Sequence, residues 1–353
     1  MSLEASAQNT QKIGSINALR FFAAIFVVFY HYAFVFFYRE STYVDLPILR
    51  HFFQYGYLGV DLFFIISGFV ISLSAEGRGA YGFLKSRIGR LYPVFWVSAL
   101  ITTLFIIFGG YLIYSEMSWS RFLTNMTMVP SLFNADALDG TYWTLAVEMK
   151  FYIVVFLLLA FKKFKDIEPL AITTSFILLF SPLYIPHDQL LWIPNFIAGI
   201  LFYKIYKNGL SKWRIIGLCN SLFISLIFAI RRVPFLSEGY VIEFKPTTIA
   251  VYIVGFYILF MMISLNKFRV SNNKYINTLG LLTYPVYLLH NQIGRIMFNY
   301  ADIKNIPLII SVPSMLIFVI ILSYGVHRLI ERRGRLILDK ALDKITPSNL
   351  KGL

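Results

Sequence analysis

Long apolar runs separated by short polar segments make up most of the chain. A helix that crosses the roughly 30 Å hydrocarbon core of a bilayer needs about 20 mostly apolar residues. About ten runs approach that length, so the pattern predicts an all-α integral membrane protein, a bundle of about ten transmembrane helices. The expected cores of these helices are 17–37, 57–75, 92–113, 142–161, 168–185, 189–204, 214–231, 247–265, 276–293 and 306–327.

Composition supports this class of protein. Of the 353 residues 58% are hydrophobic and only 14% are charged, whereas about a quarter of a soluble domain is charged. The chain is therefore expected to form one membrane domain, 16–331, with a polar cytoplasmic N-terminus, 1–15, and a basic cytoplasmic tail, 332–353. Because no apolar core precedes residue 16, the N-terminus does not resemble a cleavable signal peptide.

The net charge of +14 bears on topology. Most of the 32 Lys and Arg residues fall in segments that lie inside if the N-terminus is cytoplasmic, and cytoplasmic loops carry an excess of these residues. Both termini are therefore expected to be cytoplasmic, and nucleic acid is not expected as a partner. A single cysteine, Cys219, excludes an intramolecular disulfide, and no metal site is expected.

The first apolar run contains two residues that are costly in lipid. The stretch "LRFFAAIFVVFYHY", residues 19–32, carries Arg20 and His31. Eleven residues of α-helix separate them by about 16 Å along the axis and about 20° around it. The two side chains share a face but cannot touch, so a joint role requires an elongated ligand or channel.

Other ionisable residues fall at matching depths. Asp61, Glu148 and His290 are expected in the outer half of the membrane with His31, and Arg20 near the inner face. Ionisable residues inside a membrane are costly and commonly functional. The pattern predicts a polar cavity with a cationic inner mouth, completed by Arg87 and Arg90, and an acid/base outer chamber.

Each of these residues also has a structural alternative. A histidine can bond to a neighbouring helix, a carboxylate can cap a helix end or pair with a lysine, and arginines can set topology alone. These alternatives apply to His31, His290, Asp61, Glu148 with Lys150, Arg87, Arg90 and the close-packing pair Ser67 and Gly68.

Five stretches carry a family resemblance, in order along the chain. They are "LRFFAAIFVVFYHY", "GYLGVDLFFIISGFVIS", "SRIGRLYPVFWV", "TYWTLAVEMKFY" and "TYPVYLLH". From about residue 13 to the final "HRLIERR", the chain resembles acyltransferase family 3, multipass bacterial enzymes that include O-acetyltransferases of lipopolysaccharide O-antigen and exopolysaccharide.

The resemblance implies roles for single residues. It implies that His31 and Arg20 are the family's essential His and Arg, and that Glu148 is its motif acid. Met149 follows this acid where many relatives have a second Glu, and Lys150 stands where Gln is common, which changes the local charge. The remaining motif positions are Arg87 and Arg90 for donor binding, and Ser67, Gly68, Trp143, Tyr284 and His290 for support.

The resemblance also implies an O-acyltransferase of the bacterial inner membrane. Its donor would be cytoplasmic acetyl-CoA, and its acceptor a glycan or lipid-linked glycan on the periplasmic side. In that chemistry His31 is the general base, oriented by Glu148 or Asp61, with a transient acyl-His as a second route. A polysaccharide or small-solute exporter of the same fold is the alternative function, and a structural partner in polysaccharide assembly is a third.

Overall fold

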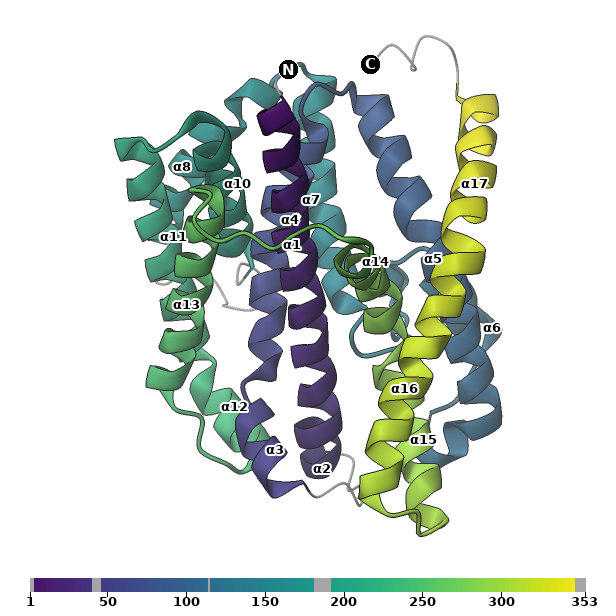
Figure 1. The fold of residues 1–353 in the computed structure, drawn as a ribbon. Coiled ribbons are helices and arrows are strands. Elements are labelled where there is room, and N and C mark those ends of the chain that lie inside the picture. Colours follow the sequence, from purple (N-terminus) through teal and green to yellow (C-terminus); the bar gives the residue numbers. More distant parts are fainter. Residues whose placement is uncertain (1–2, 40–45, 114, 181–191, 347–353) are drawn as a thin grey trace. The chain divides into compact units, whose positions relative to one another are not determined.

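A computed structural model describes residues 3–39, 46–113, 115–180 and 192–346 (Figure 1). Within these ranges the chain forms helices and short connections without a β-strand, which confirms the expected all-α class. The helices are α1 (Leu3–Phe29), η1 (Tyr30–Val35), α2 (Phe36–Arg39), α3 (Pro47–Phe53), η2 (Gly56–Leu58), α4 (Gly59–Ala75), α5 (Ala80–Gly109), η3 (Gly110–Ile113), α6 (Trp119–Asn125), η4 (Pro130–Phe133), α7 (Trp143–Ala160), η5 (Phe164–Asp166), α8 (Ile167–Leu178), α10 (Ile193–Asn208), α11 (Lys212–Arg231), α12 (Val233–Tyr240), α13 (Pro246–Ser264), α14 (Lys274–Leu289), α15 (Asn291–Ile303), α16 (Leu308–Val326), η7 (His327–Glu331) and α17 (Arg332–Ile345).

Among the described residues, 7 helices are long and apolar enough to cross a membrane. They are α1 with η1 and α2, α3 with α4, α5, α7, α11 with α12, α13, and α16 with α17. The three other expected spans, 168–185, 189–204 and 276–293, correspond to the shorter helices α8, α10 and α14. Parts of the spans 168–185 and 189–204 fall on residues 181–191, outside the described ranges. A total of about ten spans and the orientation of the termini therefore stay predictions. The expected tail, 332–353, contains α17, and residues 347–353 lie outside the described ranges.

The chain divides into two compact units. The first unit comprises Met1–Ala23, Tyr57–Ala80 and Phe151–Gly280, and the second comprises Ala24–Gly56, Tyr81–Lys150 and Leu281–Leu353. Helices α1, α5, α7 and α14 contribute residues to both units, α5 with its first residue only.

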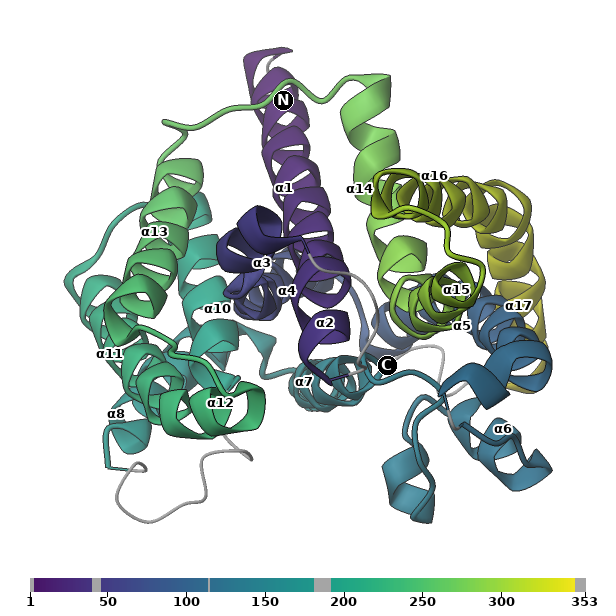
Figure 2. The ribbon, with the colours of Figure 1, turned by 90° about the horizontal axis from the view of Figure 1, so that it is seen from below.

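In the first unit α10 is the central helix. It packs against α4, α8, α11 and α13 (Figures 1 and 2), and it is buried on nearly all sides, which is why its sequence is apolar around the whole circumference. Gly68 of α4 and Gly199 of α10 bring the two backbones into contact. A Cβ on Gly68 would lie 2.4 Å from the carbonyl oxygen of Phe196 and 3.0 Å from the Cα of Gly199.

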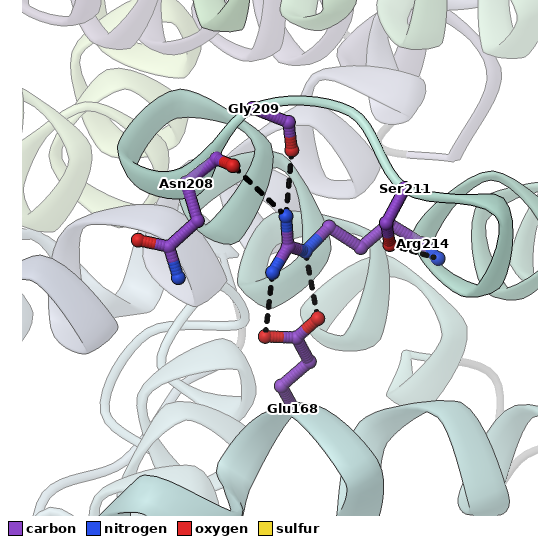
Figure 3. Close-up of polar contacts among 5 residues, drawn as sticks. All are labelled: Glu168, Asn208, Gly209, Ser211 and Arg214. Carbon is purple, nitrogen blue, oxygen red and sulfur yellow. Dashed lines mark hydrogen bonds and ion pairs between the residues drawn. The ribbon is translucent and has the colours of Figure 1, made fainter.

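An ion pair joins α8 to α11 in the same unit. The guanidinium of Arg214 donates to both carboxylate oxygens of Glu168, over 2.7 and 3.1 Å, and to the carbonyl oxygen of Gly209 over 2.7 Å (Figure 3). A longer bond of 3.4 Å reaches the carbonyl oxygen of Asn208 at the end of α10. Ser211, the N-cap of α11, accepts from the backbone N–H of Arg214. One side chain therefore ties the ends of three helices together.

In the second unit α17 packs along α5. Asp343 accepts from Lys85 over 2.6 Å and from the Tyr81 hydroxyl over 2.9 Å. A Cβ on Gly89 would lie 2.7 Å from a carboxylate oxygen of Asp339. Positions 81, 85 and 89 recur every four residues and form one face of α5, so α17 covers this face. In the same unit α15 packs against α16, η3 and η1 (Figure 2).

We expect Glu168→Ala to lower the free energy of unfolding by about 1–3 kcal/mol, because it leaves the partly buried Arg214 guanidinium without its carboxylate. Thermal unfolding of the purified protein in detergent measures the change. Glu238→Ala removes an exposed carboxylate from α12 of the same unit and serves as the control. Equal unfolding temperatures for the two variants would contradict a stabilising role for the ion pair.

Candidate active site

His31 lies where the first long helix widens. Helix α1 is regular to Phe29, and residues Tyr30–Val35 then form the π-helical segment η1. The N–H of Phe36 donates to the carbonyl oxygen of His31, five residues earlier, which is the bond of a π turn. Such turns are frequent at functional sites, because they rotate one side chain out of the regular helical register.

The imidazole of His31 meets a second histidine. Its Nδ1 lies 2.9 Å from the carbonyl oxygen of Val27 and 3.2 Å from Nε2 of His290. The two rings meet edge to face, with centroids 5.0 Å apart. His290 is completely buried, whereas His31 is only partly buried. His290 is thus the more deeply buried of the two histidines.

His290 is the single residue between α14 and α15. Its Nδ1 lies 2.8 Å from the carbonyl oxygen of Tyr287, and its own carbonyl oxygen accepts from the Tyr32 hydroxyl over 3.0 Å. Tyr32 is also completely buried and packs edge to face on Phe298 of α15. Contacts from two elements therefore hold the backbone and the ring of His290.

A buried carboxylate holds the start of α15. Asp139 is 1% exposed, and one of its oxygens accepts from the backbone N–H of Gln292 over 2.7 Å. The other oxygen accepts from the Asn291 side chain over 3.0 Å, and from the N–H and hydroxyl of Thr141 over 2.8 and 2.7 Å. A carboxylate at a helix N-terminus accepts hydrogen bonds from the unpaired N–H groups of the first turn. Its negative charge is also attracted to the positive end of the helix dipole. Asp139 also lies near enough for its charge to act on His31.

The loop that leads to Asp139 is itself fastened to α6. Arg121 donates to the carbonyl oxygen of Ala137 over 2.8 Å, and the Asn125 side chain bonds to Asp136 and Leu138 over 2.8 Å each. Partial burial lowers the pKa of the Arg121 guanidinium below its usual value, an effect that the charge of Asp136 opposes. These bonds present Asp139 to α15 in one position.

The second unit contains most of the other residues singled out from the sequence. Thr144 of α7 bonds to the Tyr287 hydroxyl over 2.9 Å, and Glu148, one turn further along α7, acts electrostatically on the same hydroxyl. Trp143 begins α7 and is 41% exposed. The Tyr284 hydroxyl donates to the carbonyl oxygen of Leu91 over 3.5 Å, which links α14 to α5.

Arg87 and Arg90 lie on α5 in this unit. Arg87 is buried, with its guanidinium 5.8 Å from the ring centre of Phe83. Arg87 follows Lys85 by two positions, which corresponds to a rotation of about 200° around the helix axis. Arg87 therefore points away from the face that carries Lys85 and α17.

The first unit contains Arg20, Asp61, Ser67 and Gly68. Asp61 is buried in the first turn of α4 and accepts from the Asn195 amide over 2.9 Å. Gly68 is the close-contact glycine against α10 described above. Among the described residues the hydrogen-bond contacts of the His31 ring are with the carbonyl oxygen of Val27 and with Nε2 of His290, and an orienting role for Glu148 or Asp61 stays a prediction.

The sequence alone assigned no role to Asp139, Tyr32 or Tyr287. The stretch "DGT", residues 139–141, places a side-chain acceptor two residues before a Thr, which is typical of a tight turn. No signal in the sequence pairs this loop with residues 291 and 292. Within the described residues there is no group of three or more His, Cys, Asp or Glu side chains that could hold a metal ion.

Comparison with known proteins decides the family. The family model for an acyltransferase domain matches residues 13–328. The chain belongs to acyltransferase family 3.

Three similar proteins have been found for this acyltransferase. A protein of Acidianus two-tailed virus with the provisional name acetyltransferase ORF330 is 26% identical over 290 residues, which cover 78% of this chain and 81% of the relative. The acyltransferase MdmB of Streptomyces mycarofaciens is 26% identical over 158 residues, 40% of this chain and 38% of MdmB. An uncharacterised protein of Haemophilus influenzae is 31% identical over 137 residues, 33% of this chain and 55% of the relative. No solved structure matches. With the apolar helices, these findings support a multipass membrane acyltransferase.

We expect Gly294→Ala in this acyltransferase to lower the free energy of unfolding by about 1–3 kcal/mol. The added Cβ would lie 2.7 Å from Cε1 of Tyr32, whose fully buried ring has no room to move. Thermal unfolding in lipid nanodiscs measures the change. Gly82→Ala on α5, where a Cβ meets nothing within 4 Å, is the matched control and is expected to be neutral or slightly stabilising. Identical unfolding temperatures would show that Tyr32 is not confined.

Proposed function

We propose that this membrane acyltransferase moves an acetyl group from cytoplasmic acetyl-CoA to a hydroxyl of a cell-surface glycan, with His31 as general base. Family membership supports the reaction class. The single observation that carries the choice of base is the 3.2 Å contact of His31 with His290 inside apolar helices. A buried pair of imidazoles can accept and hold a proton without a metal or a cofactor.

The reaction follows from the chemistry of a thioester. His31 removes the proton of the acceptor hydroxyl while the oxygen attacks the thioester carbonyl. The carbon–sulfur bond then breaks, and the CoA thiolate takes the proton from the imidazolium. The alternative route passes through an acyl-His intermediate. It needs two transfers of the acetyl group, first to His31 and then to the acceptor, instead of one.

The donor-binding residues in this proposal are Arg20 on the first helix and Arg87 and Arg90 on α5. Arginine binds phosphate through paired, charge-assisted hydrogen bonds, and the CoA head carries several phosphate groups. A distance of about 16 Å along the first helix between Arg20 and His31 suits a donor with an anionic head and a reactive thioester at its far end. In this proposal Glu148 tunes the charge in the unit that contains the base, and Trp143 and Tyr284 support that unit. Asp61, Ser67 and Gly68 support the first unit.

The acceptor in this proposal is a glycan or lipid-linked glycan at the periplasmic side of the bacterial inner membrane. Lipopolysaccharide O-antigen and exopolysaccharide are the two acceptor classes that the family resemblance implies. The acetyltransferase name of the viral relative agrees with an acetyl donor.

Export of a polysaccharide or small solute is the second candidate function. One observation favours it: a buried polar chain runs through the first unit, where Asn195 donates to Asp61 over 2.9 Å and accepts from Ser225 over 3.1 Å. Polar chains of this kind also serve proton-coupled transport. Family membership favours the enzyme.

We expect His31→Ala to reduce acetyl transfer from acetyl-CoA by at least about 100-fold, the usual contribution of a general base. The measurement is CoA release by purified protein in liposomes, with a glycan extract as acceptor. His51→Ala removes an exposed histidine of α3 and is expected to leave the rate unchanged. Turnover of His31→Ala at the wild-type rate would show that His31 is not the general base.

Mass spectrometry of surface glycan separates the enzyme from the exporter. Cells that lack the gene should produce the same glycan without one acetyl group per modified sugar. An exporter predicts less glycan at the surface, with unchanged sugar masses. Restoration of the acetyl group by the wild-type gene, but not by His31→Ala, would tie the modification to this site.

A further inference from the structure

The contacts around His290 set the protonation pattern of the whole histidine pair. Nδ1 of His290 faces the carbonyl oxygen of Tyr287 over 2.8 Å. A carbonyl oxygen only accepts, so this nitrogen carries the hydrogen. A neutral imidazole has one N–H, and Nε2 of His290 is therefore left with a lone pair.

The same donor and acceptor argument applies to His31. Its Nδ1 faces two acceptors, the lone pair of His290 over 3.2 Å and the carbonyl oxygen of Val27 over 2.9 Å. This nitrogen must also carry the hydrogen. The lone pair of His31 is then on Nε2, which has no protein hydrogen-bond partner within the part of the chain that the structure describes.

We infer that His290 is a positioning residue that holds His31 in the tautomer with its lone pair on Nε2, and that Asp139 fixes His290 through the start of α15. This inference rests on the proposed function only in naming His31 as the base. His290 touches neither donor nor acceptor and acts through the His31 ring. When Nε2 of His31 takes a proton, the N–H at Nδ1 remains bonded to the lone pair of His290, so the imidazolium keeps its orientation.

Asp139 is the anchor of this arrangement. It accepts from Gln292 N–H and from the Asn291 side chain, which directly follow His290 in the chain. Its charge also lies near enough to act on His31. The hydroxyl of Tyr32, on the same π segment as His31, bonds to the carbonyl oxygen of His290. The two histidines are thus joined both through their rings and through Tyr32.

Two variants of His290 test the inference. His290→Gln places an amide near the position of Nε2, so its oxygen can still accept from His31, whereas His290→Met fills the space without an acceptor. His51→Gln is the matched control for a His-to-Gln change at an exposed site. All are made in the full chain and reconstituted in lipid.

The first measurement is solid-state NMR of protein labelled with ¹⁵N-histidine, with His31→Asn used to assign the His31 signals. We expect a hydrogen on Nδ1 and a lone pair on Nε2 of His31 in the wild type, in His290→Gln and in His51→Gln. His290→Met leaves only the carbonyl oxygen of Val27 as an acceptor at Nδ1 of His31, and we expect a second His31 tautomer to appear beside the first. A wild-type His31 with its hydrogen on Nε2, or an unchanged tautomer in His290→Met, overturns the inference.

The second measurement is the rate of acetyl transfer. We expect His290→Met to lower kcat by about 10- to 1,000-fold with little change in KM for acetyl-CoA, and His290→Gln to retain much more activity. Equal kcat values for His290→Met and the wild type overturn the inference. The NMR measurement requires no turnover, so failure of the proposed function, seen as no transfer by the wild type, is distinguishable from failure of the tautomer assignment.

Discussion

An imidazole inside an apolar helix must find a hydrogen-bond partner within the protein, because the hydrocarbon core contains no water to supply one. His31 finds that partner in His290, at 3.2 Å. The requirement is mutual, since His290 is completely buried and bonds in turn to the carbonyl oxygen of Tyr287. Several contacts of the second unit hold these two rings together.

Three kinds of support keep them in place. The π turn at Tyr30–Val35 rotates His31 out of the regular register of the first helix. The Tyr32 hydroxyl holds the backbone of His290, and Gly294 leaves room for the Tyr32 ring. Asp139 accepts from the backbone N–H of Gln292 at the start of α15, and it lies on a loop that Arg121 and Asn125 fasten. Each support acts on the orientation of a ring, and a general base must lie within hydrogen-bond reach of the proton that it removes.

The first unit is stabilised differently. Its centre is a helix, α10, that is buried around nearly its whole circumference, and its closest contact is between two glycines where backbones touch. Van der Waals packing at small residues is the usual source of helix association in membranes, because lipid removes the hydrophobic driving force between helices. Its polar contacts include the Asp61–Asn195 bond and the Glu168–Arg214 pair, and each of them joins two helices.

The sequence by itself determined the class of fold, the family and the residues that lipid makes costly. Hydrophobic run length is a local property, so the all-α membrane class was readable from the pattern, and His31, Glu148 and His290 stood out because ionisable groups are rare there. The family resemblance rested on motifs that are also local, and the family model confirms it.

Only the tertiary structure decided which of those groups meet. His31 and His290 are 259 positions apart, and Asp139 reaches residues 152 and 153 positions away. Helical periodicity says which face a side chain occupies but not which helix lies opposite that face. The partner is set by packing between helices distant in sequence, and so the bond that orients the histidine could be seen only in the folded chain.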